Sequence, residues 1–181
     1  MGNIYFTSDL HFGHDKSFLY EPRGFESIWK HDEQIIKNWN EIINIDDDIY
    51  ILGDLMLGDN SHGIQCIKQL KGNIHVIRGN HDTDSRMKLY NNCYNIVEIT
   101  EGQFFKWRHY HFYLSHYPCI CSNYDVDKPL KARMINLCGH RHTNDYAIDM
   151  DKGLCYHVEL DAHYNYPIKI ENIIEDIKTC I

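Results

Sequence analysis

Short apolar runs alternate with amphipathic stretches along the first half of the chain. Aromatic and β-branched residues predict buried strands over residues 3–8 and 49–52, and in "NIHVIRGNHD", which ends in a Gly-Asn-His-Asp turn. Between the strands, "HDEQIIKNWNEIIN" carries its apolar residues at helical spacing, and "GIQCIKQLKG" predicts a helix that ends at Gly72. The acidic run at residues 46–48 predicts a solvated turn before the second strand. This alternation is typical of a sheet covered by helices.

The second half consists mostly of strand-like runs. "NIVEIT", "HYHFYLSHYP", "MINLCGHRH" and "LCYHVEL" each predict a strand, and residues 170–177 predict a closing helix. The stretch "KWRHYHFY", residues 106–113, alternates like one half-exposed strand, although basic and aromatic residues together also occur on surfaces that stack on nucleic-acid bases. With no linker or repeat in between, residues 1–181 are expected to form a single α/β domain.

Composition narrows the class of protein. The formal net charge is −8, whereas a broad grip on DNA or RNA needs clustered Lys and Arg, so long nucleic acid is not an expected partner. No run approaches the roughly 18 apolar residues of a membrane span, and no secretion signal is evident at the N-terminus. The seven cysteines are scattered, with only C-x-C at Cys119 and Cys121, which is typical of a reducing compartment. We therefore expect a cytoplasmic protein that does not enter a membrane; its oligomeric state does not follow from the sequence.

Histidines are concentrated in loops. Six of the 13 histidines fall in four short segments, each directly after an apolar run. The chemical motifs, in chain order, are "SDLHFGH" at 8–14, "LGD" at 52–54, "GNHD" at 79–82, "SHYP" at 115–118 and "GHRH" at 139–142. Because functional groups gather at the carboxyl ends of strands in open α/β sheets, we expect these five motifs to meet.

The side chains of these motifs predict a metal site. A lone Asp-x-His turn is more often structural than metal-binding. Here, however, two carboxylates, one amide and five or six imidazoles exceed the roughly four ligands of one tetrahedral zinc ion. They suit two divalent ions that share a carboxylate, an arrangement that polarises phosphoryl oxygens and activates water. The mixed nitrogen and oxygen ligands suit Mn, Fe, Zn, Co or Ni.

The order D-x-H, G-D, G-N-H-D, S-H and G-H-x-H closely resembles the calcineurin-like metallophosphoesterase superfamily. The resemblance runs from Asp9 to His142, and the tail "ELDAHYNYPIKIENI" resembles the end of the small microbial and phage members. It implies a four-layer αββα sandwich, in which two mixed β-sheets are flanked by helices. It also implies a dinuclear, metal-dependent phosphoesterase in which a hydroxide bridging the metals attacks phosphorus.

Carried over residue by residue, the resemblance implies a complete set of metal ligands. Asp9, His11 and His142 would hold one ion. Asn80, His116 and His140 would hold the other, and Asp54 would bridge the two. Manganese is favoured by the resemblance, with iron, zinc, nickel or cobalt as alternatives.

Three further residues are candidates for acting on the substrate. By the same resemblance, His81 would protonate the leaving oxygen or stabilise charge on the phosphoryl group; its alternative role is only to orient a ligand. His14, in the "HFGH" extension of the small members, would lie over the phosphate. Arg141 would contact a phosphate oxygen unless its side chain points away.

The expected class of substrate rests on the resemblance alone. The phosphoprotein phosphatase branch carries an Asp-Arg pair shortly after its G-D, and "GDLMLGDN" lacks it, which argues against protein dephosphorylation. Likeness to the small members favours a phosphodiester or small nucleotide-like substrate. A phosphomonoesterase, a nuclease and a non-catalytic scaffold of the same fold remain alternatives, although a scaffold does not need the full ligand set present here.

Overall fold

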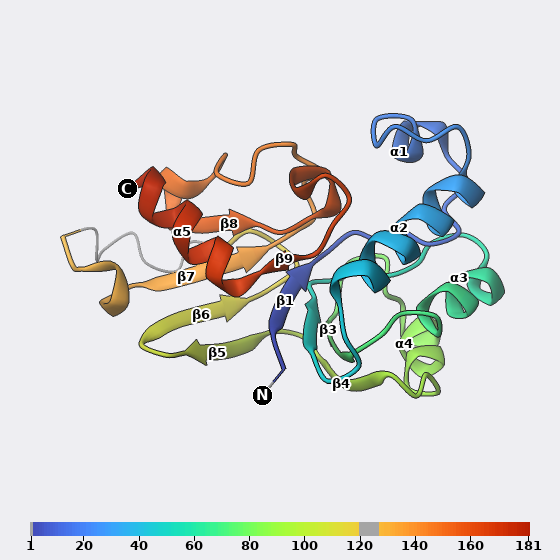
Figure 1. The fold of residues 1–181 in the computed structure, drawn as a ribbon, viewed down its shortest axis with the longest axis horizontal. Coiled ribbons are helices and arrows are strands. Elements are labelled where there is room, and N and C mark those ends of the chain that lie inside the picture. Colours follow the sequence, from blue (N-terminus) through green and yellow to red (C-terminus); the bar gives the residue numbers. More distant parts are fainter. Residues whose placement is uncertain (1, 120–126) are drawn as a thin grey trace.

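The computed structural model describes residues 2–119 and 127–181, and it contains two β-sheets (Figure 1). The first sheet has the order β4 (Ile96–Thr100), β3 (Asn73–Ile77), β2 (Asp48–Ile51), β1 (Ile4–Thr7) and β9 (Ile168–Lys169). Strands β1 to β4 are parallel, and β9 runs antiparallel to β1. The second sheet has the order β5 (Gln103–Trp107), β6 (Tyr110–Leu114), β7 (Met134–Cys138) and β8 (Cys155–His157).

Helices cover both sheets. Helices α2 (Ile28–Ile42), α3 (Asn60–Ile67) and α4 (Asp84–Tyr90) lie on one side of the first sheet, and α5 (Ile170–Cys180) lies toward the second (Figure 1). The short α1 (Ser17–Tyr20) lies in the loop between β1 and α2, and short 3-10 turns occupy Leu130–Ala132, Met150–Lys152 and Leu160–His163. In the second sheet β5 and β6 are antiparallel and the remaining pairs parallel. Both sheets are therefore mixed, and the predicted metallophosphoesterase architecture is confirmed.

Alternating side chains divide the buried residues into two cores. Along β2, Ile49 and Ile51 face α2, α3 and α4, while Tyr50 faces the second sheet. The core between the sheets also takes in the apolar stripe of α5, from Ile170 to Ile177. Because the first sheet is buried on both faces, the carboxyl ends of its strands are held rigidly, and these ends carry three of the predicted motifs.

Four details of the sequence interpretation are wrong. Residues 106–113 are not one strand but a hairpin, because β5 pairs with β6 from Gln103↔Leu114 to Trp107↔Tyr110. The helix expected to end at Gly72 ends at Ile67, and α4 was not predicted. The acidic run at 46–48 is not wholly solvated, since Asp47 is buried. Cys121, and with it the C-x-C pair, lies outside the described residues. Among the helices of the described segments, none is long and apolar enough to cross a membrane.

Candidate metal centre

The five predicted motifs meet where their strands end. They follow β1, β2, β3, β6 and β7 directly, as the sequence predicts. The loops are tied to one another through the backbone: the N–H of Asp9 donates to the carbonyl of Gly53 at 3.0 Å, and that of His11 to the carbonyl of Asp54 at 3.0 Å. The N–H of Gly139 likewise donates to the carbonyl of His116 at 3.0 Å. These bonds fix the loops of each sheet relative to one another.

The backbone at this point adopts an uncommon conformation. Five predicted ligands have a left-handed backbone with positive φ: Asp9 (58°), His11 (52°), Asp54 (57°), His140 (76°) and His142 (49°). Non-glycine residues seldom adopt it, and such strain collects at functional sites. Gly139 allows a close approach, since a Cβ there would lie 2.5 Å from Asp9 Oδ2. The turns are therefore shaped to aim side chains inward rather than to minimise backbone energy.

The first ligand set is Asp9, His11 and His142. Asp9 Oδ1 lies 3.7 Å from His11 Nε2 and 3.6 Å from His142 Nε2, and these two nitrogens are 3.1 Å apart. Asp9 Oδ2 is occupied, because it accepts hydrogen bonds from Ser8 Oγ at 2.6 Å and from the N–H of His140 at 2.9 Å. Asp9 Oδ1 is buried and has no hydrogen-bond partner among the described residues. An unpartnered carboxylate oxygen that faces two imidazole nitrogens is what a cation site requires.

The second ligand set is Asn80, His116 and His140. His116 Nδ1 donates to the carbonyl of Leu52 at 2.8 Å, which leaves the lone pair of Nε2 pointing inward. That nitrogen lies 2.8 Å from Asn80 Oδ1 and 3.2 Å from His140 Nδ1. Acceptor atoms converge here, and a divalent ion between them would satisfy all three.

Asp54 lies between the two sets. Its Oδ2 is 3.7 Å from His11 Nε2 in one set and 3.5 Å from His116 Nε2 in the other, while Oδ1 accepts from the N–H of His81 at 2.8 Å. The side chain is buried. Its position fits the bridging role that the sequence predicts, and the residues present fit a pair of divalent ions.

The charges of the centre also favour cations. Burial alone raises the pKa of the Asp9 carboxyl, but the nearby imidazoles of His11, His142 and His116 hold it well below its usual range. Burial lowers the pKa of His11 to about 4, so its imidazole is neutral at neutral pH and can act as a ligand. Burial, opposed by His116 and reinforced by Asp9, raises the pKa of Asp54 to about 6. A positive ion would offset the electrostatic repulsion between the carboxylates of Asp9 and Asp54.

His81 and His14 lie at the rim of the centre. His81 Nε2 is 4.0 Å from Asp54 Oδ2, and its side chain is 42% exposed, so the ring can reach a bound molecule. His14 Nδ1 is buried without a hydrogen-bond partner among the described residues, and its ring lies 5.5 Å from that of His11. Both rings line one cavity of about 800 Å³, together with His11 and His142.

Arg141 is placed differently. Its Nη1 forms an ion pair with Asp149 Oδ2 at 2.7 Å, and the residue lines a separate cavity of about 520 Å³ beside His140. The pair with Asp149 raises the pKa of the exposed guanidinium. The structure therefore brings the seven predicted ligands, His81 and His14 together, and leaves Arg141 at the edge with its charge partnered.

Comparison with known proteins shows the family of the chain. The sequence model of the calcineurin-like phosphoesterases matches residues 2–177. The chain belongs to the calcineurin-like phosphoesterase family. Membership indicates a phosphoester hydrolase that uses divalent metal ions, in agreement with the clustered ligands Asp9, His11 and His142, and Asp9, Asp54 and His116.

This phosphoesterase has full-length relatives. It is 27% identical over 183 residues to the uncharacterized protein MJ1445 of Methanocaldococcus jannaschii, a match that covers 98% of this chain and 93% of the relative. It is 28% identical over 204 residues to the Gene 66 protein of Mycobacterium phage D29, with 98% of each covered. Among solved structures, AQ665 from Aquifex aeolicus, a protein of unknown function, superposes with a TM-score of 0.72 at 21% identity, covering 98% of this chain and all of that one. The last likeness supports the fold.

Two supports of the phosphoesterase site were not predicted. Asp161 Oδ2 accepts from His142 Nδ1 at 3.1 Å and is held by Arg23 Nη2 at 2.7 Å, and the same Arg23 nitrogen donates to the carbonyl of Asp9 at 2.8 Å. Asp82 accepts from the N–H groups of Asp54 and Gly79 at 2.8 and 2.9 Å. Both residues lay within quoted stretches, Asp82 in "GNHD" and Asp161 in the family-like tail. Their place in these two stretches was the signal in the sequence that could have identified them.

Proposed function

We propose that this protein is a phosphodiesterase that hydrolyses small, nucleotide-like diesters with two divalent ions, manganese being the preferred metal. One observation carries the proposal: a cavity lies beside each ligand set. The larger one adjoins His11 and His142, and the other adjoins His140. A phosphodiester has two substituents on phosphorus, and two cavities that flank the ligands offer each of them a place.

The larger cavity suits an aromatic or sugar-like group. Its wall includes Phe18, Leu57 and Tyr164, with Phe18 and Tyr164 exposed at 71% and 91%. Such rings can stack on a nucleobase. The Phe18 ring lies 5.6 Å from that of His14, edge to face, which places an aromatic surface next to the residue expected over the phosphate.

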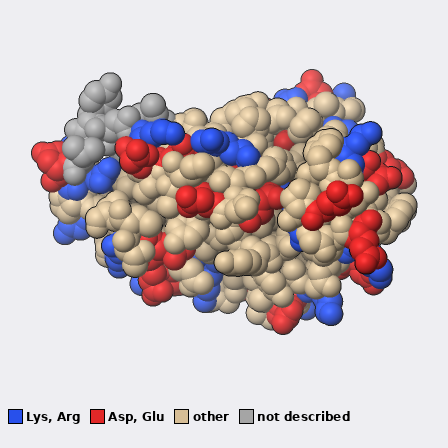
Figure 2. All heavy atoms as spheres, turned by 90° about the horizontal axis from the view of Figure 1, so that it is seen from above, with Lys and Arg blue, Asp and Glu red and all other residues tan. Residues whose placement is uncertain are grey.

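The charges around the larger cavity favour a singly charged phosphate. Among the described residues that line the larger cavity, Arg23 is the only Lys or Arg, and its guanidinium is already engaged by Asp161, His31 and the carbonyl of Asp9. A diester carries one negative charge and a monoester about two, so a diester makes the smaller demand on additional cations. On the face seen in Figure 2, acidic and basic side chains are interspersed, which supports a small substrate rather than a long polyanion.

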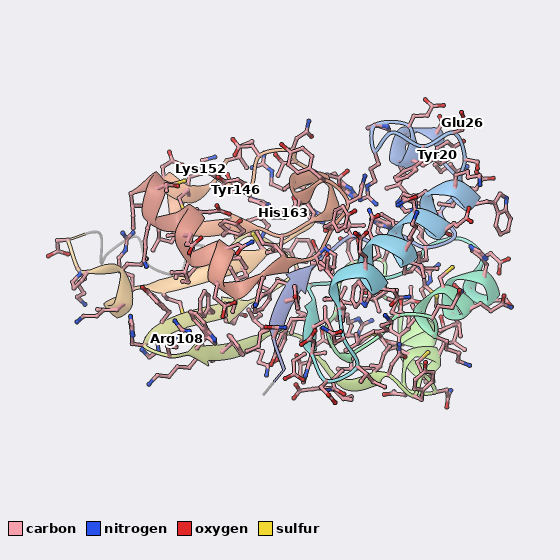
Figure 3. The ribbon with its side chains drawn as sticks, viewed as in Figure 1. Tyr20, Glu26, Arg108, Tyr146, Lys152 and His163 are labelled. Atoms are coloured by element: carbon pink, nitrogen blue, oxygen red, sulfur yellow. The ribbon has the colours of Figure 1, made fainter. Side chains whose placement is uncertain are left out.

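The hairpin stretch with a nucleic-acid-like composition lies away from this cavity. Arg108 lies at the turn between β5 and β6, at the end of the molecule opposite the loop that holds Tyr20 and Glu26 (Figure 3). Its guanidinium packs over the Trp107 ring at 4.2 Å. Trp107 and Arg108 are therefore partnered within the hairpin, and a role in stacking on nucleic acid is not part of the proposal.

The residues of the centre would divide the work as follows. Asp9, His11 and His142 would hold one ion, Asn80, His116 and His140 the other, with Asp54 shared between them. When bound, such ions polarise the phosphoryl group and make a water molecule more acidic. His81 would donate a proton to the leaving oxygen, and His14 would orient the phosphate from above. Leu57 and Phe18 would exclude water from one side.

The proposal is tested by comparing bis-p-nitrophenyl phosphate with p-nitrophenyl phosphate. The metal-stripped protein is refilled with Mn²⁺, and kcat/KM is measured for both compounds. We expect the diester to be preferred and its hydrolysis to require metal. Asp54→Asn should abolish it, whereas Asp46→Asn, the same change at an exposed position, should leave it intact. Preference for the monoester, or equal activity of Asp54→Asn, would contradict the proposal.

A further inference from the structure

A second group of metal-ligating side chains lies outside the centre described above. It consists of Asp32 on α2 and of His62 and Cys66 on α3, whose ligand atoms lie within 4.8 Å of one another. His62 Nε2 is 2.7 Å from Asp32 Oδ2, and Cys66 Sγ is 3.4 Å from His62 Nε2 and 4.0 Å from Asp32 Oδ2. Ligands at roughly 2.0–2.3 Å around a tetrahedral zinc ion form a triangle of similar size.

The helices hold these three side chains in place. His62 and Cys66 are four residues apart on α3, so they project from the same face of the helix. Asp59 caps the start of α3 through hydrogen bonds from the N–H groups of Ser61 and His62. The arrangement does not depend on long, mobile side chains.

Asp32 is oriented by two further donors. Its Oδ2 accepts from the N–H of Gly13 at 2.9 Å, and its Oδ1 accepts from His31 Nδ1 at 2.7 Å. His31 Nδ1 must be the donor because Arg23 donates to its other nitrogen. Hydrogen bonds of this kind fix the orientation of ligating carboxylates in metal sites.

The cluster has an open side. Asp32 and Cys66 are buried, but the His62 side chain is one-fifth exposed, and all three residues line a cavity of about 310 Å³. Trp29 forms part of the same cavity, and its ring lies 4.5 Å from that of His62. An ion can therefore enter from solvent and keep a water molecule as its fourth ligand.

We propose that Asp32, His62 and Cys66 bind one zinc ion at this place, separate from the catalytic pair. None of the three residues belongs to the two ligand sets, so the site is independent of the proposed phosphodiesterase activity. A thiolate beside an imidazole and a carboxylate suits Zn²⁺ and Co²⁺ better than Mg²⁺ or Mn²⁺.

Binding requires two proton movements. Cys66 loses its thiol proton to solvent, and the proton of His62 moves from Nε2 to Nδ1 so that Nε2 can coordinate. Burial raises the pKa of Cys66 to about 12, so the thiol stays protonated until a cation arrives. The bond from His62 Nε2 to Asp32 Oδ2 is replaced by bonds from both atoms to the ion.

Cobalt provides the test, because Co²⁺ bonded to a thiolate gives a charge-transfer absorption and the predicted catalytic ligands include no cysteine. Chelated protein is titrated with Co²⁺. We expect the final intensity of this absorption to correspond to one thiolate-bound Co²⁺ per chain. The absorption should disappear when Zn²⁺ is added. Cys66→Ser should abolish it, whereas Cys93→Ser, a change at another buried cysteine, should retain it. Absence of the absorption in the unaltered protein, or its survival in Cys66→Ser, would overturn the proposal.

His62→Ala provides a second variant in case loss of Cys66 impairs folding. His62 is partly exposed, so its truncation removes little packing. The thiolate absorption should then require at least about tenfold more free Co²⁺ to reach half-saturation. An unchanged titration in His62→Ala would contradict the ligand set.

Discussion

Asp54 Oδ2 and Asp9 Oδ1 are the two oxygens around which the imidazoles of the centre are arranged. Asp9 Oδ1 has no hydrogen-bond partner among the described residues, and Asp54 Oδ2 faces histidines of both sets. The backbone N–H of His81 donates to Asp54 Oδ1, while its exposed ring, with Nε2 4.0 Å from Asp54 Oδ2, lines the larger cavity. Burial separates His81 from Asp9, His11, Asp54 and His116, which are buried, but not from Asn80, His140 and His142, which are exposed.

His81→Ala should reduce turnover of a diester by about 10²–10⁴-fold, since general acid catalysis contributes an effect of this size. Metal content should stay the same, because the N–H of residue 81 still donates to Asp54. Steady-state kinetics and elemental analysis of the purified variant measure both. His109→Ala, at the exposed β5–β6 turn, serves as the control. Loss of a metal ion from His81→Ala would count against the assigned role.

Asp161→Asn should weaken binding of one of the two ions by about 10–100-fold, the usual cost of altering a residue that orients a metal-binding histidine. The variant removes the charge that accepts from His142 Nδ1 and pairs with Arg23. Calorimetric titration with Mn²⁺ should resolve one weakened and one unchanged site. Asp151→Asn, at an exposed position, should bind as the unaltered protein does. Two unchanged sites in Asp161→Asn would show that His142 does not need this support.

At the scale of elements, the site was more predictable than some of the structure around it. Apolar runs in the sequence predict strands β1, β2, β3, β6 and β7, and each motif comes just after one of them. The geometry of the sheets therefore predicts that the motifs meet. The hairpin at Arg108 was missed because no Gly, Asn or Pro marks its turn. The pairing of Arg23 with Asp161 joins residues 138 positions apart, and nothing local in the sequence indicates it.

Asp47, which the sequence predicts to be solvated, is buried and connects two secondary-structure elements. Its carboxylate accepts from the N–H of Asn3 at 2.6 Å and of Asn44 at 2.8 Å, and so joins the start of β1 to the turn after α2. Burial alone raises the pKa of Asp47, but these hydrogen bonds outweigh burial and lower it.

Asp47→Ala should lower the free energy of unfolding by about 1–3 kcal/mol at neutral pH, because two partly buried N–H donors lose their charged acceptor. Since the folded pKa lies below the unfolded value, this contribution is complete above about pH 4 and is lost as pH falls through the folded pKa. Urea unfolding at a series of pH values measures it. Asp46→Ala should show little effect. A loss of stability in Asp47→Ala that did not shrink at low pH would contradict the role of its charge.

At the scale of the whole molecule, two sheets contribute to one centre. The first sheet supplies Asp9, Asp54 and Asn80, and the second supplies the loops with His116, His140 and His142. Because ligands come from both sheets, bound ions would link them across the shared core. Buried carboxylates in close proximity also make the centre costly without cations, so metal binding and folding are expected to be coupled.

The most direct test of the proposed dinuclear centre is electron paramagnetic resonance of protein loaded with Mn²⁺, combined with a count of bound manganese. We predict two ions per chain with the spectrum of a magnetically coupled pair, and loss of the coupling in Asp54→Asn. The Asp46→Asn variant should retain the coupled spectrum. A single bound ion, or two ions with uncoupled spectra in the unaltered protein, would contradict the assignment of Asp54 as the shared ligand.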